Sequence, residues 1–333
     1  MKPARVAVLG TGGTISYRAR HPLDLYDYAD GGVIQTADQL IASLPALPPG
    51  IDLVPVAFRA LSSTRMGPDE WLELNELVHR VAADDPSLAG IVVTHGTATL
   101  EETAYFLDLV VKLEIPVVLV GAQRPSGGLS SDSGLNLLNA CQVAAAPAAR
   151  GLGVLVVLNG EIQAAREVTK TSTWRVQTFR TPDLGVLGHA DPDGRIAIYR
   201  SPLRRHTTAT AFDVRGLRQL PRVDIAYSYA GSDGAAIDAF VRAGARAVVV
   251  ASLAPGRLTP GEARAATAAI GSGVHMVMST RAGSGRVIPL RSLREAGLIA
   301  ADNLGPQKAR VLAMLALTRT TLAGEIQAVF DDH

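Results

Sequence analysis

Two short turns carry the side chains that could do chemistry. One turn, TGGTIS at residues 11–16, follows a short apolar run near the start of the chain. The other, THGTAT at residues 94–99, follows an apolar run at residues 88–93. Each turn places a threonine, Thr14 or Thr97, just beyond a predicted buried strand, and open α/β sheets bind ligands at the carboxyl ends of their strands. We therefore predict that the two turns are halves of one site.

A lysine completes this set. Lys170 lies in the hydroxyl-rich segment VTKTST at residues 168–173. A threonine hydroxyl needs a base to act as a nucleophile, and a lysine can serve when burial or its neighbours lower its pKa. Backbone N–H groups at glycine turns and helix starts can stabilise an oxyanion. Thr14, Thr97 and Lys170 therefore favour acyl transfer or hydrolysis, although a glycine turn and a solvated loop lysine are the ordinary interpretations of the same residues.

The elements that must position these side chains follow the alternation of an α/β fold. In the first half, apolar strands alternate with helices whose apolar residues recur every three to four positions, which predicts a doubly wound sheet. A polar stretch then leads into a second α/β unit. The predicted strands are at 6–9, 51–58, 88–93, 116–120, 152–158, 223–227, 247–251 and 276–279, and the helices at 35–44, 68–83, 103–112, 134–146, 235–243, 260–270 and 308–317.

These patterns predict a two-domain α/β protein with a larger N-terminal and a smaller C-terminal parallel-sheet domain. We place the N-terminal catalytic domain at residues 1–198, the connection at 199–219 and the C-terminal domain at 220–333. The length of 333 residues agrees with this division, because single cores tend to split beyond about 250–300 residues.

Composition and charge exclude several classes of protein. The net charge is +1 and the only cluster of basic residues is Arg204-Arg205, so neither nucleic acid nor an anionic membrane is an expected partner. The single cysteine, Cys141, excludes an internal disulfide and falls on an apolar helix face, which predicts a packed core thiol. The chain lacks both common phosphate-loop patterns, which disfavours a nucleotide enzyme. With no apolar run of membrane length and no secretory segment, we expect a cytoplasmic protein.

Several ordered motifs resemble those of the bacterial-type L-asparaginase (asparaginase/glutaminase) family, and the similarity runs nearly from end to end. TGGTI at 11–15 is similar to the first family signature, and THGT at 94–97 with EETAYF at 101–106 is similar to the second. Further matching blocks are VGAQRPS at 120–126, VTKT at 168–171, RHT at 205–207 and PQKAR at 306–310.

The resemblance implies an amidohydrolase of two α/β domains that acts on a small molecule and needs no metal or organic cofactor. Members of the family are usually homotetramers with sites between neighbouring subunits, and we expect a homo-oligomer, a dimer or a tetramer. Carried over by position, Thr14 matches the primary nucleophile, Thr97 the second threonine and Lys170 the lysine that pairs with it. Tyr28 is our choice for the loop tyrosine that activates Thr14, with Tyr26 as the rival.

The substrate-binding positions carried over are Ser63, Thr64, Gly96 and Ala98. Ser63 matches the serine that holds the substrate's α-carboxylate. Ala98 replaces the family's aspartate, which meets the α-ammonium of the substrate and also contacts the lysine. Thr64 stands where a polar residue usually helps to hold the same ammonium. Without the aspartate, we predict a lowered pKa for Lys170.

Two segments of the second domain also depart from the family pattern. The region before Gly297 shows no match to the glutamate that a neighbouring subunit contributes, and SLAPGR at 252–257 lacks the expected asparagine. Three hypotheses follow: an enzyme that hydrolyses the side-chain amide of L-asparagine or a related carboxylate amide; a family hydrolase acting on an amide, ester or lactone without the α-ammonium, whose acid is held by Ser63 and Arg65; and a catalytically weak ligand-binding member.

Four further side chains in the matching blocks have ordinary interpretations. Glu101 and Glu102 are expected at the start of a helix, where negative charge is favoured. His95 and His206 are expected to orient loops through hydrogen bonds rather than to act as general bases.

Overall fold

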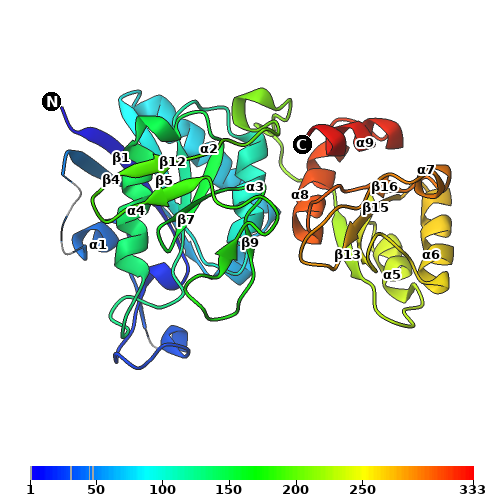
Figure 1. Ribbon diagram of the computed structural model, residues 1–333, viewed down its shortest axis with the longest axis horizontal. Coiled ribbons are helices and arrows are strands. Elements are labelled where there is room, and N and C mark those ends of the chain that lie inside the picture. Colours follow the sequence, from blue (N-terminus) through cyan, green and yellow to red (C-terminus); the bar gives the residue numbers. More distant parts are fainter. Residues whose placement is uncertain (1, 31, 45, 47–48) are drawn as a thin grey trace. The chain divides into compact units, whose positions relative to one another are not determined.

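The computed structural model describes residues 2–30, 32–44, 46 and 49–333. The chain forms two compact units, Met1–Gly216 and Leu217–His333 (Figure 1). The division between the two units falls within the segment 199–219 that the sequence marks as a connection. The helices of the described part include none that is both long and apolar enough to cross a membrane.

The first unit is built on an eight-stranded sheet with helices on both faces (Figure 1). Its strands in spatial order are β12 (Ile196–Ile198), β11 (Gly188–Ala190), β8 (Glu161–Ala164), β7 (Val154–Leu158), β6 (Val117–Val120), β5 (Leu88–Thr94), β1 (Ala4–Gly12) and β4 (Ile51–Leu61). The run from β7 to β4 is parallel throughout. Its carboxyl ends therefore meet at one edge of the sheet.

The predicted two-domain α/β fold is confirmed, but the larger sheet is mixed rather than parallel. β8, β11 and β12 pair antiparallel, beginning with the β7–β8 hairpin. Asn159 and Gly160 connect these two strands with φ angles of 54° and 73°. Two consecutive positive φ angles make a two-residue turn that reverses the chain, and Asn-Gly is its strongest sequence signal. The sequence contained that signal, but the prediction treated it as a strand end.

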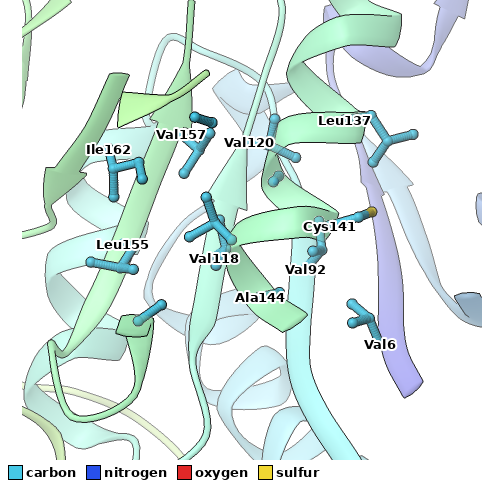
Figure 2. Packing of buried hydrophobic residues seen from close by; sticks show 14 of the residues in the cluster. Val6, Val92, Val118, Val120, Leu137, Cys141, Ala144, Leu155, Val157 and Ile162 are labelled. Atoms are coloured by element: carbon cyan, nitrogen blue, oxygen red, sulfur yellow. The ribbon is translucent and has the colours of Figure 1, made fainter. Parts of the chain in front are cut away.

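One face of this sheet is covered by α4 (Ser133–Ala145) and, near β4, by α1 (Ala37–Ala42). Figure 2 shows Cys141 of α4 beside Val92 of β5, and Leu137 of the same helix belongs to the same buried cluster. The Cys141 side chain is completely buried, and burial raises the pKa of its thiol to about 12. The prediction of a packed core thiol is confirmed.

The helices α2 (Pro68–Asp84) and α3 (Leu100–Val110) pack against each other. The rings of Trp71 and Phe106 stack with centroids 5.3 Å apart, and Trp71 Nε1 donates a 2.9 Å hydrogen bond to Thr103 Oγ1. α3 begins three residues before the predicted 103–112, so Glu101 and Glu102 lie in its first turn. Negative charge there interacts favourably with the helix dipole, as expected from the sequence.

Short elements complete the first unit. The two-residue strands β2 (Tyr17–Arg18) and β3 (Val33–Ile34) pair with each other, as do β9 (Thr169–Lys170) and β10 (Phe179–Arg180). Lys170 therefore lies on a strand and not in the polar loop that its neighbours suggested. The 3₁₀ turns are η1 (Thr14–Ser16), η2 (Tyr28–Asp30), η3 (Ser63–Arg65), η4 (Pro147–Ala149) and η5 (Thr207–Ala209).

The second unit has a four-stranded sheet that is parallel, as predicted. Its strands are β13 (Val223–Tyr227), β14 (Ala247–Ser252), β15 (His275–Thr280) and β16 (Ile299–Ala300), in that spatial order. Its helices are α5 (Ala235–Arg242), α6 (Pro260–Gly271), α7 (Arg291–Glu295), α8 (Pro306–Leu317) and α9 (Ala323–Asp332).

Candidate active site

Four loops meet at the carboxyl edge of the large sheet because the strands that precede them are neighbours. The spatial order of these strands is β6, β5, β1 and β4. The loops after them carry Gln123, Thr97, Thr14 and Ser63, in the same order. The two threonine turns recognised in the sequence thus follow adjacent strands.

Two glycines let these loops approach each other. A Cβ atom on Gly13, whose φ is 80°, would lie 2.2 Å from the Cα of Gly96. A Cβ atom on Gly96 would lie 2.5 Å from the Cβ of Ser63. Neither distance is possible for real side chains, so only glycine permits this contact. Thr11 Oγ1 joins the same two turns by donating a 2.6 Å hydrogen bond to the carbonyl of Thr94.

Thr14 is paired with a tyrosine from the following loop. Thr14 Oγ1 and the Tyr28 hydroxyl are 2.6 Å apart, and the Tyr28 ring packs edge-on against Tyr17 with centroids 5.5 Å apart. The rival Tyr26 is 69% exposed. The loop is also fixed to the segment after β6, since Ala19 N donates to the carbonyl of Ser126 at 2.8 Å. The structure therefore brings Tyr28 to Thr14.

Thr97 forms a second cluster with Lys170 and Gln123. Lys170 Nζ donates to Thr97 Oγ1 at 2.6 Å and to Gln123 Oε1 at 3.0 Å. Thr97 Oγ1 donates to the same Gln123 Oε1 at 3.0 Å. The side chains of Thr97 and Gln123 are each 7% exposed, so these hydrogen bonds are largely shielded from water.

The surroundings of Lys170 shift its pKa away from the value of a free lysine. Burial lowers the pKa of Lys170, and the carboxylate of Glu101 partly opposes this shift. The direction of this shift agrees with the lowered pKa expected from the sequence. The predicted cause was the loss of an aspartate at position 98, whereas the largest contribution in the structure is desolvation of the ammonium.

The residues assigned to substrate binding differ in their exposure to solvent. Ser63 is half-buried against Gly96, and its carbonyl accepts a 2.8 Å hydrogen bond from Thr99 Oγ1. Thr64 is exposed and shares a 2.9 Å hydrogen bond with Ser62 Oγ. Ala98 follows Thr97 directly and is exposed to solvent.

The two histidines of the matching blocks make local hydrogen bonds. His95 is buried, and its Nδ1 is 2.8 Å from the carbonyl of Gly96. Burial lowers the pKa of His95 to about 4, which keeps the imidazole neutral near pH 7. His206 Nδ1 is 3.0 Å from Thr207 Oγ1, and burial also lowers the pKa of His206. These contacts agree with the predicted role of orienting loops.

We searched the described part of the chain for side chains that could bind a metal ion. Within residues 2–30, 32–44, 46 and 49–333, we find no group of three or more His, Cys, Asp or Glu side chains placed to hold an ion. Thr, Tyr, Lys and Gln, which make up the two clusters, are not a typical donor set for a metal.

Sequence reasoning missed the contribution of Gln123. The residue stood in view in the block VGAQRPS, directly after a predicted strand. Its position at the end of β6, beside β5, was the signal that could have placed it near Thr97. Its hydrogen bond with Lys170 could not be predicted from the sequence in the same way, because Lys170 lies on the short strand β9, which pairs antiparallel with β10.

The fold and the two clusters define a class of protein. Hydroxyls paired with a tyrosine and with a lysine, at the carboxyl ends of adjacent parallel strands, are typical of an enzyme that acts through a hydroxyl nucleophile. Comparisons with known proteins then identify the family. The model of the N-terminal asparaginase domain matches residues 5–204, and that of the glutaminase/asparaginase C-terminal domain matches residues 222–330. The chain belongs to the asparaginase family.

Individual relatives are similar over almost the whole chain. L-asparaginase 2 of Bacillus subtilis is 41% identical over 329 residues, which cover 98% of this chain and 86% of the relative. Glutaminase-asparaginase of Pseudomonas fluorescens is 37% identical, covering 100% of this chain and 91% of the relative. The crystal structure of the probable cytoplasmic L-asparaginase of Campylobacter jejuni superposes with a TM-score of 0.91 at 37% identity, covering 99% of this chain and all of the other.

Proposed function

We propose that this protein is an asparaginase-like amidohydrolase that hydrolyses the side-chain amide of L-asparagine or of a related small carboxylate amide. The observation that carries the proposal is the pairing of each threonine hydroxyl with a proton-handling partner. Thr14 lies 2.6 Å from the Tyr28 hydroxyl, and Thr97 lies 2.6 Å from Lys170 Nζ. Relatives named L-asparaginase and glutaminase-asparaginase support the same reaction.

In this proposal Thr14 is the nucleophile and Tyr28 the residue that activates it. Thr14 Oγ1 attacks the amide carbon while its proton passes through the hydrogen bond to the Tyr28 oxygen, and Tyr28 passes its own hydroxyl proton on to the amide nitrogen. The C–N bond breaks, ammonia leaves with that proton, and Tyr28 ends with the protonation it began with. Water then hydrolyses the threonyl ester, which releases the acid and restores the Thr14 hydroxyl. Negative charge develops on the amide oxygen, and we assign its stabilisation to N–H groups of the turn at Gly96, beside the N-terminus of α3.

Thr97 and Lys170 form the second proton-handling pair. A neutral Lys170 can accept the hydroxyl proton of Thr97 across their 2.6 Å hydrogen bond, and burial supports this role by lowering the lysine pKa. We assign Ser63, Thr64, Gly96 and Ala98 to the substrate-binding surface because they surround the two threonine turns in sequence and, for Ser63 and Gly96, in space.

A second candidate substrate class follows from Ala98. An aspartate at this position would offer an anion to the substrate's α-ammonium, and an alanine methyl group offers none. Because Ala98 is exposed directly beside Thr97, it supports a substrate without the ammonium: an amide, ester or lactone that carries a carboxylate. Ser63 and the exposed Arg65 are the residues we assign to that carboxylate.

The test is a hydrolysis screen that compares L-asparagine and L-glutamine with their des-amino amides, small esters and lactones. Wild-type protein and Thr14→Ala are assayed side by side, with ligand binding followed by thermal shift. We expect turnover of at least one amide by the wild type and its loss in Thr14→Ala. A variant that keeps both ligand response and turnover would refute Thr14 as the nucleophile. Ligand response without turnover in the wild type would instead identify a catalytically weak binding protein.

We also propose that the protein is a cytoplasmic homo-oligomer, a dimer or a tetramer, that binds a small-molecule substrate. A structural relative described as probably cytoplasmic supports the location, although a relative from Haemophilus influenzae is described as probably periplasmic. Cell fractionation tests the location, and sedimentation velocity tests the assembly. Recovery of the protein in the periplasm would overturn the first proposal, and a monomer at working concentration would overturn the second.

A further inference from the structure

Gln123 is the acceptor shared by the two members of the second proton-handling pair. Its Oε1 receives hydrogen bonds from Thr97 Oγ1 and from Lys170 Nζ, both at 3.0 Å. We propose that Gln123 is a positioning residue, whose uncharged amide oxygen holds Lys170 against Thr97 without adding a negative charge to the site. This inference rests on the proposed function, in which Lys170 is the base for Thr97.

The orientation of the Gln123 amide is fixed at both ends of the residue. Its backbone N–H donates to the Asp132 carboxylate, with distances of 3.2 and 3.1 Å to the two oxygens. Its Nε2 donates to the carbonyl of Thr173 at 3.1 Å. The reversed amide would face NH₂ hydrogens toward the ammonium of Lys170 and an oxygen toward the carbonyl of Thr173, leaving neither contact satisfied. The oxygen must therefore face Thr97 and Lys170.

One neutral acceptor serves both protonation states of the lysine. When Lys170 is charged, its N–H groups donate to Thr97 and Gln123, and the Thr97 hydroxyl donates to Gln123, which is the arrangement observed. When Lys170 has lost a proton, the Thr97 hydrogen can turn from Gln123 to the Nζ lone pair, while a remaining N–H still donates to Gln123. Proton transfer then breaks the Thr97 O–H bond and forms an N–H bond on Lys170, with no movement of heavy atoms.

A carboxylate in place of this amide would change the balance between the two states. An anion in direct contact with an ammonium favours the charged form, and a charged lysine cannot accept a proton. The carboxylate that acts on Lys170 in the structure is Glu101 of α3, while its partner across the β9–β10 pair is the apolar Phe179. The amide oxygen of Gln123 thus accepts the hydrogen bond that a second carboxylate would accept, but it carries no negative charge.

The test uses two substitutions that should move Lys170 in opposite directions. Gln123→Glu adds a charge at the acceptor position, and we expect the Lys170 titration to move up by about one to three pH units. Gln123→Met keeps a side chain of similar length but removes the oxygen that accepts a hydrogen bond from the charged Lys170. We therefore expect the Lys170 titration to move down by about one pH unit. The acidic limb of the profile of kcat/KM against pH should move by the same amounts.

The titration can be read without turnover by competitive labelling with trace acetic anhydride, which acylates an amine only when the amine is neutral. The label is then measured by mass spectrometry of the Lys170 peptide. The labelling thus tests the role of Gln123 separately from the proposed function. Opposite shifts of the Lys170 titration in the two variants, with no ammonia release by the wild type, would refute the proposed function and support the role of Gln123. Turnover by the wild type, with no shift of the Lys170 titration in either variant, would support the proposed function and refute the role of Gln123.

A matched control is Gln163→Met. Gln163 is 1% exposed, its Oε1 accepts a 2.9 Å hydrogen bond from Thr181 Oγ1, and its Nε2 donates to the carbonyl of Phe179 at 2.9 Å. Like Gln123, it accepts from a threonine hydroxyl and donates to a backbone carbonyl; its Nε2 also donates to the Glu161 carboxylate at 3.2 Å. None of these hydrogen bonds is to the ammonium of Lys170. We expect no shift of the Lys170 titration in this control. Equal shifts in the control, or shifts of the same sign in both Gln123 variants, would overturn the inference. Should Gln123→Glu fail to fold, a downward shift in Gln123→Met supports it and an unmoved titration overturns it.

Discussion

Ala98→Asp is the substitution that separates the two candidate substrate classes. The side chain at position 98 is exposed, so a carboxylate there needs no rearrangement of the core and should change stability by less than about 0.5 kcal/mol. Its position directly after Thr97 places the new charge where the α-ammonium of asparagine would bind in our proposal. A hydrogen bond to a charged group contributes about 1.5–3 kcal/mol, and about 1.4 kcal/mol corresponds to a tenfold change. We therefore expect kcat/KM for asparagine to rise by about 10- to 150-fold.

The assay is ammonia release, measured for asparagine and for its des-amino analogue with the wild type, Ala98→Asp and Ala98→Asn. The ratio of the two kcat/KM values cancels effects that reach both substrates. Ala98→Asn matches the shape of aspartate without its charge and should leave this ratio close to that of the wild type. A new carboxylate near Lys170 also favours the charged lysine, so each variant is compared at its own pH optimum. An unchanged ratio in Ala98→Asp would refute the reasoning.

Three further predictions concern single groups. Tyr28→Phe should lower kcat at least 100-fold, because it removes the hydroxyl that is hydrogen-bonded to the nucleophile. Tyr26→Phe, at a 69% exposed position, should change kcat less than twofold. Equal changes of kcat in the two variants, measured in the steady state, would contradict this prediction. A lysine must be neutral to act as a base, and burial lowers the pKa of Lys170 below 10.5. We therefore expect kcat/KM to rise with pH up to that lowered pKa and then to level off. A profile in which kcat/KM falls over this pH range would exclude Lys170 as the base. Thr103→Val should lower the free energy of unfolding in urea by about 1–3 kcal/mol, because it leaves the buried Trp71 Nε1 without an acceptor, and an unaltered midpoint would contradict this.

The sequence predicted the site best where one turn follows one strand. Thr14 and Thr97 each lie just beyond a buried apolar run, and runs of that kind are reliable signs of parallel strands. Their meeting depends on β1 and β5 being neighbours in the sheet, which the carboxyl-end rule made a reasonable prediction. The choice between Tyr26 and Tyr28 needed the structure, because the path of a polar loop is not encoded in a simple periodic pattern.

Features set by reversed strands escaped the sequence analysis. The hairpin at Asn159 and Gly160 turned a predicted parallel sheet into a mixed one. Lys170 was expected in a loop, yet a two-residue strand too short to show alternation holds it. Gln123 was visible after its strand, but its contact with the lysine joins residues 47 positions apart in the chain. Local patterns specify elements, and contacts of this range depend on the tertiary arrangement.

The central claim is that Thr14 forms a covalent ester with the acyl part of the substrate. Its most direct test is acid quenching during turnover of an amide that the wild type hydrolyses, followed by peptide mapping by mass spectrometry. We predict an acyl group on the peptide that contains Thr14, absent from the Thr14→Ala variant, which should also release no ammonia above background. An acyl group on the Thr97 peptide, or ammonia release that persists at the wild-type rate in Thr14→Ala, would contradict the account.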